Sequence, residues 1–289
     1  MTNQAQKLAE IVGSQHIGKS VKTKFIAVTS GKGGVGKTTI SANMGYILAQ
    51  SGAQVGLLDA DIGLANLDLM LGVKPEKTIL SIMRGECGVE DILMRIDKTL
   101  YLIPGENGGD ILKFRESYAL ERFYDEIKKL DFLDYLVVDT GAGIGESVQT
   151  FLKAADETII VTTPDPAAIT DAYSMMKTLS DSPKRLLMIV NQTHSDREGD
   201  RVFAGIAKVA AKNLPNIEPI LLGSLPKDDE IAQSVRGRYL FAKESGGLRT
   251  GARLNEIARK LLRFMERGVL ETKRGSGFGG FFKRLLDQF

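Results

Sequence analysis

Cysteine is nearly absent from this sequence, because Cys87 is the only one among 289 residues. A single thiol excludes an internal disulfide, a CxxC metal site and an iron–sulfur cluster held by several cysteines. No apolar run approaches the roughly 18 residues that a membrane-spanning helix needs, so any membrane contact is expected to be peripheral. No signal peptide precedes the first apolar run, and we therefore expect a reducing cytoplasm.

A strong excess of either charge is also missing. The chain has 38 Lys and Arg against 36 Asp and Glu, which gives a formal net charge of +2. The basic residues are spread along the chain rather than massed, so direct nucleic-acid binding is not expected. Apolar residues make up 43% of the sequence, and a chain of this length can bury one large core without a second domain.

Short apolar runs rich in β-branched residues alternate with segments of helical spacing. Most of these runs are near-continuous, which is typical of strands buried on both faces. We predict an α/β fold with a doubly wound, mainly parallel sheet and helices on both faces. The predicted domain covers residues 23–267, with tails at 1–22 and 268–289. The predicted strands are residues 25–29, 54–58, 101–103, 135–138, 158–162, 186–190 and 220–223, and the predicted helices are 39–50, 116–130, 147–154, 167–179, 202–214 and 253–264.

The segment GKGGVGKTT at residues 31–39 has the spacing of a phosphate-binding loop. Its glycines let backbone N–H groups surround phosphate oxygens, Lys37 adds a positive charge, and the Thr38 hydroxyl can reach Mg²⁺. A predicted strand precedes this loop and a predicted helix follows it, as the motif requires. A nucleotide phosphate is therefore the expected ligand. The expected contacts are Gly33, Gly34, Val35, Gly36, Lys37, Thr38 and Thr39.

A second lysine, Lys32, stands ahead of Lys37 in the same loop. Proteins with a phosphate-binding loop form a very large class, and an extra lysine at this position is typical of one branch of that class. The alternative is a solvated loop lysine that has no role at the phosphates.

Carboxylates follow two of the predicted strands, and ligands of such sheets bind beyond the carboxyl ends of the strands. Asp59 and Asp61 come after residues 54–58. We assign Asp61 to the water that attacks the γ-phosphate and Asp59 to the metal side. The alternative for both is that they cap the next turn or helix.

Asp139 ends the predicted strand at 135–138, which is the form of the second nucleotide motif that holds Mg²⁺. Thr38, Asp59 and Asp139 are thus the predicted metal side, although Asp139 also fits a simple turn at a strand end. The DTGAGIG segment is a candidate switch loop, whose backbone near Gly143 is expected to sense the γ-phosphate.

Weaker signals follow the last two predicted strands. The amide of Asn191 offers a donor and an acceptor that suit an adenine edge. Pro226 and Asp228 stand where the other wall of a base pocket is expected. All three residue types are also common in turns.

The motifs GKGGVGKTT, LLDADIGLANLDLMLG and VVDTGAGIG together resemble those of the MinD/ParA family of deviant-P-loop ATPases, over about residues 24–265. The LDADIGLANLDLMLG and TTPDPAAITDAY stretches are most similar to the FlhG branch, also called FleN, of MinD-like regulators of flagellar number. The resemblance implies a homodimer enclosing two ATP molecules, in which Lys32 reaches the partner's phosphates and Asp61 activates water. It also implies adenine contacts for Asn191 and for the segment that begins at Pro226 and ends at Asp228.

The spacing of apolar residues over 278–289 predicts an amphipathic helix with one apolar stripe. Lys283 and Arg284 lie on its polar face, and a GSG hinge at 275–277 precedes it. Such a helix suits an anionic membrane surface, and the resemblance implies a membrane-targeting helix here. The alternative is a helix packed on the core or on a dimer seam. The stripe consists of Phe278, Phe281, Phe282, Leu285, Leu286 and Phe289.

The first residues, NQAQKLAEIV after the initial Met-Thr, resemble the DQAxxLR element of the FlhG branch, which stimulates the GTPase FlhF. Gln4, Ala5 and Leu8 match, whereas Asn3 replaces the acidic residue and Ala9 replaces the arginine. We expect an FlhF-type GTPase to bind residues 1–20, with an idle tail as the alternative.

The leading hypothesis is an ATPase (ATP and water to ADP and phosphate) whose catalytic residues are Lys32, Lys37 and Asp61. ATP would close a homodimer that attaches reversibly to the inner face of the cell membrane. This switch would control flagellar number or placement with an FlhF-type GTPase and with basal-body or regulatory proteins. The alternatives are a MinD-like division-site ATPase and a ParA-like DNA-partitioning ATPase.

Overall fold

The computed structural model describes residues 23–61, 66–105, 117–244, 249–267 and 277–286. Its strands are β1 (Lys24–Ser30), β2 (Val55–Ala60), β3 (Met94–Arg95), β4 (Leu100–Ile103), β5 (Tyr135–Ala142), β6 (Glu157–Thr162), β7 (Lys184–Thr193) and β8 (Ile217–Pro226). Its helices are α2 (Lys37–Gln50), α3 (Leu67–Leu71), α4 (Ile79–Arg84), α5 (Val89–Ile92), α7 (Ser117–Lys128), α8 (Glu146–Ala154), α9 (Pro166–Thr178), α10 (Asp196–Asn213), α11 (Asp229–Gly237), α12 (Phe241–Glu244), α13 (Arg249–Arg267) and α14 (Phe278–Leu286).

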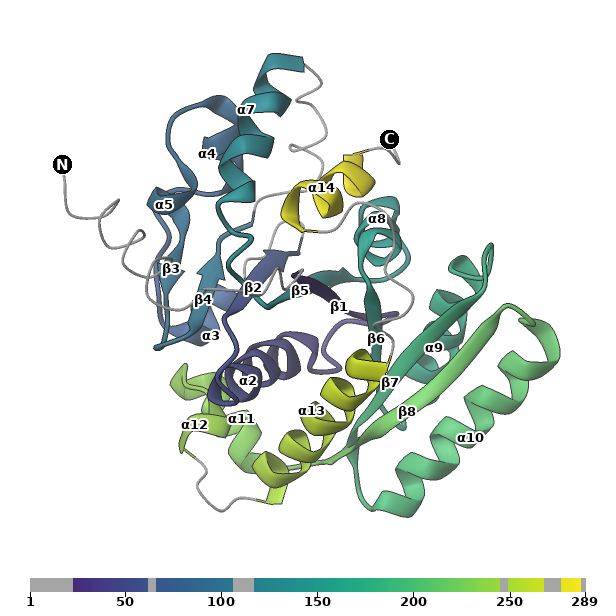
Figure 1. The fold of residues 1–289 in the computed structure, drawn as a ribbon. Coiled ribbons are helices and arrows are strands. Elements are labelled where there is room, and N and C mark those ends of the chain that lie inside the picture. The colour runs from purple at the N-terminus through teal and green to yellow at the C-terminus, as the bar shows by residue number, and fades with distance from the viewer. Residues whose placement is uncertain (1–22, 62–65, 106–116, 245–248, 268–276, 287–289) are drawn as a thin grey trace.

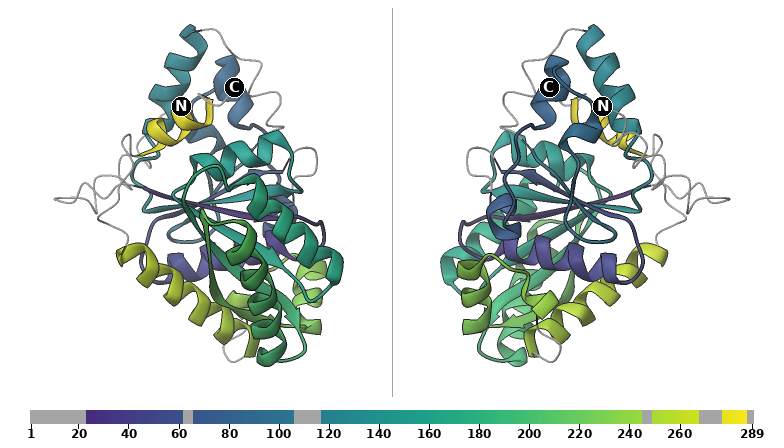
Figure 2. Two further views of the ribbon diagram at one scale, coloured as in Figure 1. Left: turned by 90° about the vertical axis from the view of Figure 1, so that its right-hand side faces the viewer. Right: turned by 90° about the vertical axis from the view of Figure 1, so that its left-hand side faces the viewer.

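The strands form one sheet of order β3-β4-β2-β5-β1-β6-β7-β8 (Figure 1). Neighbouring strands are parallel, except that β3 runs antiparallel to β4. Helices cover both faces, with α2 and α13 on one side and α7, α8 and α14 on the other (Figures 1 and 2). The predicted doubly wound, mainly parallel sheet is confirmed.

The near-continuous apolar runs are explained by apolar packing on both faces of the sheet. Successive side chains of a strand point to opposite faces. In β1, Ile26 and Val28 pack in the core beside α2, while Phe25 packs in the core beside α14. A strand of this kind has no polar face, so its sequence does not alternate.

Several short elements were not predicted from the sequence. They include β3, α3, α4, α5 and α12, each too short to show a clear period, and also the nine-residue helix α11. The predicted helix at 202–214 begins earlier, at Asp196, because the Ser195 side chain accepts a hydrogen bond from the Glu198 N–H and caps the helix. The polar first turn carries no apolar period.

The C-terminal helix is confirmed as α14, but its apolar stripe faces the protein. Phe281 stacks on Phe25 of β1 with ring centroids 4.3 Å apart and an interplanar angle of 3°. Phe278, Phe282 and Leu285 are also buried. The described side chains of the stripe predicted to face a membrane therefore lie against the core, because α7, α8 and β1 offer a matching apolar groove. The packed alternative describes this structure.

Polar contacts fix both ends of α14. The Phe278 N–H donates to Asp131 Oδ1 at 2.8 Å, and Arg284 Nε donates to the Ala154 carbonyl at 3.0 Å. Within the described ranges, no helix is both long and apolar enough to cross a membrane. The predicted GTPase-binding segment at 1–20, most of the hinge at 275–277, and Phe289 lie outside the described residues.

Candidate functional site

A cavity of about 1120 Å³ opens at the carboxyl ends of the central strands, where a parallel sheet binds its ligands. The loop after β1, the loop after β2 and the start of α11 contribute to its wall. Among the predicted site residues, the lining includes Gly33, Gly34, Gly36, Lys37, Thr38, Thr39, Asp61, Asn191, Pro226 and Asp228. Lys32, Val35, Asp59 and Asp139 do not line it.

The phosphate-binding loop has the backbone that its glycines permit. Gly34 and Gly36 adopt φ angles of 78° and 94°, which L side chains rarely do. Gly36 is the N-cap of α2, and no side chain caps this helix. The N–H groups of its first turn are therefore available to an anion at the cavity floor. Lys37 opens the helix and is buried with it.

The loop is also held against its neighbours. A Cβ on Gly31 would lie 2.4 Å from the backbone carbonyl of Asp171 in α9, so only glycine fits. The Gly143 N–H donates to the Ser30 carbonyl at 2.9 Å, which joins the candidate switch loop to the start of the phosphate-binding loop. A movement of one loop would therefore displace the other through this hydrogen bond.

Asp139 lies below the loop on the central strand β5, between Val28 of β1 and Asp59 of β2 in the sheet register. It is 1% exposed. Its Oδ1 accepts a hydrogen bond from Ser41 Oγ at 2.9 Å, whereas its buried Oδ2 has no partner among the described residues. An unpaired carboxylate oxygen beside Thr38 fits a Mg²⁺ ion or one of its waters.

Burial raises the pKa of Asp139 to about 7. The proximity of the Thr38 hydroxyl, the charge of Lys37 and the hydrogen bond from Ser41 oppose this shift, and the nearby Asp59 carboxylate adds to it. A bound divalent cation would favour the charged form.

The raised pKa of Asp139 predicts a pH-dependent stability for the protein without nucleotide or metal. The folded state holds the proton up to about pH 7, whereas the ordinary value is 3.8. Between these values the folded state binds more protons, so the free energy of unfolding falls as pH rises. Urea denaturation of Asp139→Asn should show a fall smaller by roughly 3 to 5 kcal/mol. Parallel pH profiles for the two proteins would contradict this origin.

Asp59 braces the loop after β2. Its Oδ1 accepts from the Asp61 N–H at 3.2 Å, and its Oδ2 accepts from the N–H groups of Asn66 and Leu67 at 3.0 Å. Burial raises the pKa of Asp59 despite these bonds. This is the capping alternative for Asp59, while its metal role stays a prediction.

Asp61 is half-buried at the cavity wall. Its Oδ1 would lie 3.0 Å from a Cβ on Gly141, so the bare backbone of β5 makes room for the carboxylate. Asn66 Nδ2 lies 3.5 Å from the other oxygen. Asp61 therefore stands between the loop after β2 and the candidate switch loop, and its role in orienting water stays a prediction.

Asn191 lies between the phosphate-binding loop and the wall at β8. Its Nδ2 donates to the Val35 carbonyl at 2.8 Å, and its buried Oδ1 has no partner in the described part of the chain. An unpaired acceptor of this kind fits a donor such as the adenine amino group. Asp228 instead caps α11 through the Glu230 N–H at 3.0 Å and accepts a short hydrogen bond from Thr250.

Sequence reasoning missed other residues of the cavity. Gln192 adopts a φ of 58°, an uncommon conformation directly after Asn191. Arg236 and Arg238 line the opposite wall from α11 and its C-cap. The run of acids at 228–230 was the available signal for the start of α11, but no local pattern marks these arginines.

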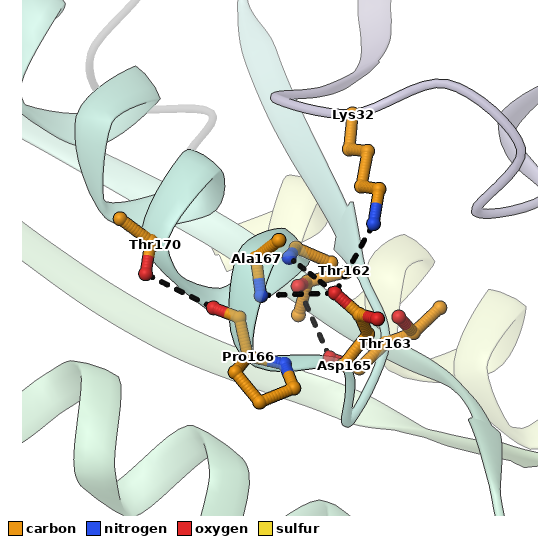
Figure 3. Close-up of polar contacts among 8 residues, drawn as sticks. Lys32, Thr162, Thr163, Asp165, Pro166, Ala167 and Thr170 are labelled. Atoms are coloured by element: carbon orange, nitrogen blue, oxygen red, sulfur yellow. Dashed lines mark hydrogen bonds and ion pairs between the residues drawn. The ribbon is translucent and has the colours of Figure 1, made fainter.

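Lys32 extends toward Asp165 at the start of α9 (Figure 3) and is not among the residues that line the cavity. Its Nζ lies 3.2 Å from Asp165 Oδ1. The two lysines of the loop are therefore separated, with Lys37 at the cavity and Lys32 at the molecular surface.

A glycine-rich loop between a buried strand and a helix, with a lysine and a buried carboxylate on the neighbouring strand, defines a P-loop nucleotide-binding protein. The sequence model of the ParA family, described as NUBPL iron-transfer P-loop NTPase, matches residues 21–262. The chain therefore belongs to the ParA family of P-loop NTPases. That description mentions iron transfer. This chain contains one cysteine, Cys87, and therefore cannot hold an iron–sulfur cluster through several cysteines.

Curated relatives narrow the comparison. The chain is 43% identical to the flagellum site-determining protein YlxH of Helicobacter pylori, over 99% of both chains. It is 37% identical to the antiactivator FleN of Pseudomonas aeruginosa, over 78% of this chain and 79% of that one. These relatives confirm the predicted resemblance to the FlhG branch.

A solved structure has the same fold. The MinC:MinD cell division protein complex of Aquifex aeolicus contains a chain 29% identical to this one, with a TM-score of 0.66. The match covers 83% of this chain and 96% of that one.

Proposed function

We propose that this chain is an ATP-hydrolysing dimerisation switch that regulates flagellar number or placement. The observation that carries the proposal is the position of Lys32, which lies in the phosphate-binding loop but outside its own cavity. From this position, Lys32 is proposed to serve a phosphate in a second subunit. The proposed role in flagellar number or placement is supported by the relative whose name is flagellum site-determining protein.

Residues in the cavity and directly beneath it have separate roles in the proposed hydrolysis. Backbone N–H groups around Gly34 and Gly36 bind the phosphates, and Lys37 balances their charge. Asp61 orients a water molecule, because phosphoryl transfer depends mostly on positioning and charge. Thr38 and Asp139 would hold Mg²⁺, which supplies further charge neutralisation at the phosphates.

Membrane attachment is part of the proposed switch, and α14 has to leave its groove to accomplish it. The same apolar face cannot contact the core and a lipid surface at once. Full burial of a large apolar side chain contributes about 1.5 to 3 kcal/mol, so the docked state competes strongly with lipid. A closed dimer presents two copies of α14 and gains avidity at the membrane.

A cross-link that holds α14 in place tests membrane attachment. A Cβ on Gly279 would lie 3.7 Å from Cγ of Lys128 in α7, so these two adjacent positions are chosen for a disulfide. In a Cys87→Ser background, Gly279→Cys with Lys128→Cys should float with anionic vesicles and ATP when reduced, and lose at least about 90% of this binding when oxidised. Each single-cysteine variant is the control. Equal flotation of oxidised and reduced protein would exclude α14 as the anchor.

Truncation is a poorer test than the cross-link. Removal of residues 277–289 would take Phe278, Phe281, Phe282 and Leu285 out of the core. The uncovered groove would expose apolar surface, and the truncated chain would lose stability together with its anchor.

The proposed flagellar role depends on a partner protein that binds the N-terminal tail. An FlhF-type GTPase is proposed to bind residues 1–20, which distinguishes a flagellar role from a division role. A pull-down of that GTPase by the full chain, but not by a chain lacking residues 1–20, would support this assignment. Equal recovery by both chains would remove it.

A further inference from the structure

The outer side of α13 carries a cluster of basic side chains. The helix has the sequence RTGARLNEIARKLLRFMER, in which six basic residues stand against two acidic ones. Its apolar side, which includes Leu254 and Leu261, packs in the core beside α2. Arg259, Lys260 and Arg263 are exposed on the other side, within little more than one turn. These three residues are called the α13 basic face below.

The side chains of the α13 basic face are unpaired in the described part of the chain. Arg253, earlier on the same helix, shows the contrast, because it forms ion pairs with Asp196 and Glu256. Between residues 257 and 265 the helix contains no carboxylate at all. The charge of the basic face is therefore available to an anionic partner outside this chain.

The end of α13 lies at the same edge of the sheet as α14, where the parallel strands begin (Figure 2). Arg185, at the start of β7, places its Cζ 4.9 Å from the ring centroid of Phe264 in α13. Phe25, at the start of β1, stacks on Phe281 of α14. Residues 268–276 connect the two helices, and a chain of that length spans at most about 35 Å. Insertion of α14 into a membrane would therefore hold the end of α13 within this distance of the lipid.

We propose that the α13 basic face binds the head groups of anionic phospholipids and supplies a second signal for membrane attachment. The inference rests on the proposed attachment through α14. One weak apolar anchor gives marginal and reversible binding, which a basic patch makes stable. The α13 basic face is exposed while α14 is docked. It can therefore contact an anionic surface before α14 leaves its groove.

A nucleic acid is the other polyanion that a basic surface can bind. Three cations would neutralise about three phosphates, fewer than the roughly 6 to 10 contacts of a typical DNA-binding protein. Base stacking needs an open aromatic ring, and the ring of Phe264 is covered by Arg185. The short covalent connection to α14 favours the membrane instead.

The expected size of the effect follows from the number of charges. Each basic residue near an anionic membrane strengthens binding by about 5-fold, so the loss of all three should weaken it by about 100-fold. The effect should disappear in about 1 M salt, where the screening length is only about 3 Å.

The test variant replaces Arg259, Lys260 and Arg263 together by Gln, which removes the charge and keeps a good helix former. Partition coefficients are measured by vesicle flotation with Mg²⁺ and a non-hydrolysable ATP analogue. On vesicles of phosphatidylcholine mixed with phosphatidylglycerol, we expect the variant to bind about 100-fold more weakly than wild type at low salt. On pure phosphatidylcholine the two proteins should bind equally.

Matched variants isolate the charge and its place. Arg259→Lys with Arg263→Lys keeps every charge and should bind like wild type. Arg197→Gln, Arg201→Gln and Lys208→Gln together remove three exposed charges from α10 and should also leave binding unchanged. Thermal denaturation and ATP hydrolysis without vesicles should be the same in all these proteins, because each altered side chain is exposed.

Equal binding of wild type and the neutralised α13 variant to anionic vesicles would overturn the second signal while attachment through α14 stands. An equal loss in the α10 variant would also overturn it, because net charge would then explain the effect. A loss of duplex DNA binding with unchanged vesicle binding would assign the face to nucleic acid instead. If wild type with the ATP analogue binds no vesicles, membrane attachment itself is overturned, and the inference with it.

Discussion

Asp61→Ala is expected to slow ATP hydrolysis by at least about 100-fold, because loss of a group that orients or activates water removes a contribution of that order. ATP binding should change by less than about threefold, since the phosphates bind to the backbone and to Lys37. Asp61 stands beside Gly141 with no backbone N–H bound to its carboxylate among the recorded contacts, so its loss leaves the loop intact. Phosphate release under single-turnover conditions measures the rate, and a fluorescent ATP analogue measures binding.

A matched carboxylate is available for the Asp61 experiment. Asp68 lies seven positions along, in the first turn of α3, and outside the cavity lining. Asp68→Ala should hydrolyse ATP within about threefold of wild type. Equal losses in both variants would mean that disturbance of the segment after β2, rather than the Asp61 carboxylate, explains the effect.

Lys32→Ala is expected to lower hydrolysis by about 100-fold or more, because a cationic side chain supplied in trans has effects of at least this size in related chemistry. Nucleotide binding by the monomer should stay within about twofold, since Lys32 does not line its own cavity. Lys37→Ala is the contrasting variant and should weaken nucleotide binding itself. Monomer binding lost equally in both variants would place Lys32 at its own phosphates.

The sheet was predictable because strands buried on both faces appear in the sequence as continuous apolar runs. One of its two central strands, β1, has that form from Phe25 through Val28. The shortest elements were not predictable, because a helix of four residues such as α12 forms only where tertiary contacts hold it. The Ala242 N–H, for example, donates to Asn43 Oδ1 of α2, which lies 199 residues earlier.

The sequence also predicted in part which site residues lie close together in the fold. Parallel strands bring Asp59 and Asp139 into register, as their positions at two strand ends indicate. Their roles do not follow from residue type, because aspartate serves equally as a metal ligand and as a cap. The structure separates the two by their bonds: Asp59 accepts three backbone N–H groups, whereas one oxygen of Asp139 has no described partner.

Contacts between segments that are far apart in the chain could not be predicted from the sequence. An apolar stripe shows that α14 buries one face, but it does not say whether protein or lipid covers that face. The docking of Phe281 on Phe25 depends on a groove built from segments over 200 residues earlier in the chain and from α7 and α8. In the same way, nothing in the loop at residues 31–39 indicates that Asp165 holds Lys32.

Mixing two inactive variants tests the central claim, that each nucleotide site is completed by Lys32 of the other subunit. A hybrid of Lys32→Ala with Asp61→Ala has one site with an intact Asp61 and an intact Lys32 from the partner. Random pairing makes about half of the dimers hybrids with one working site each, so an equimolar mixture should recover about a quarter of wild-type hydrolysis. If Lys32 acts within its own subunit, no site in the hybrid is complete, and a mixture as inactive as its two components would contradict the account.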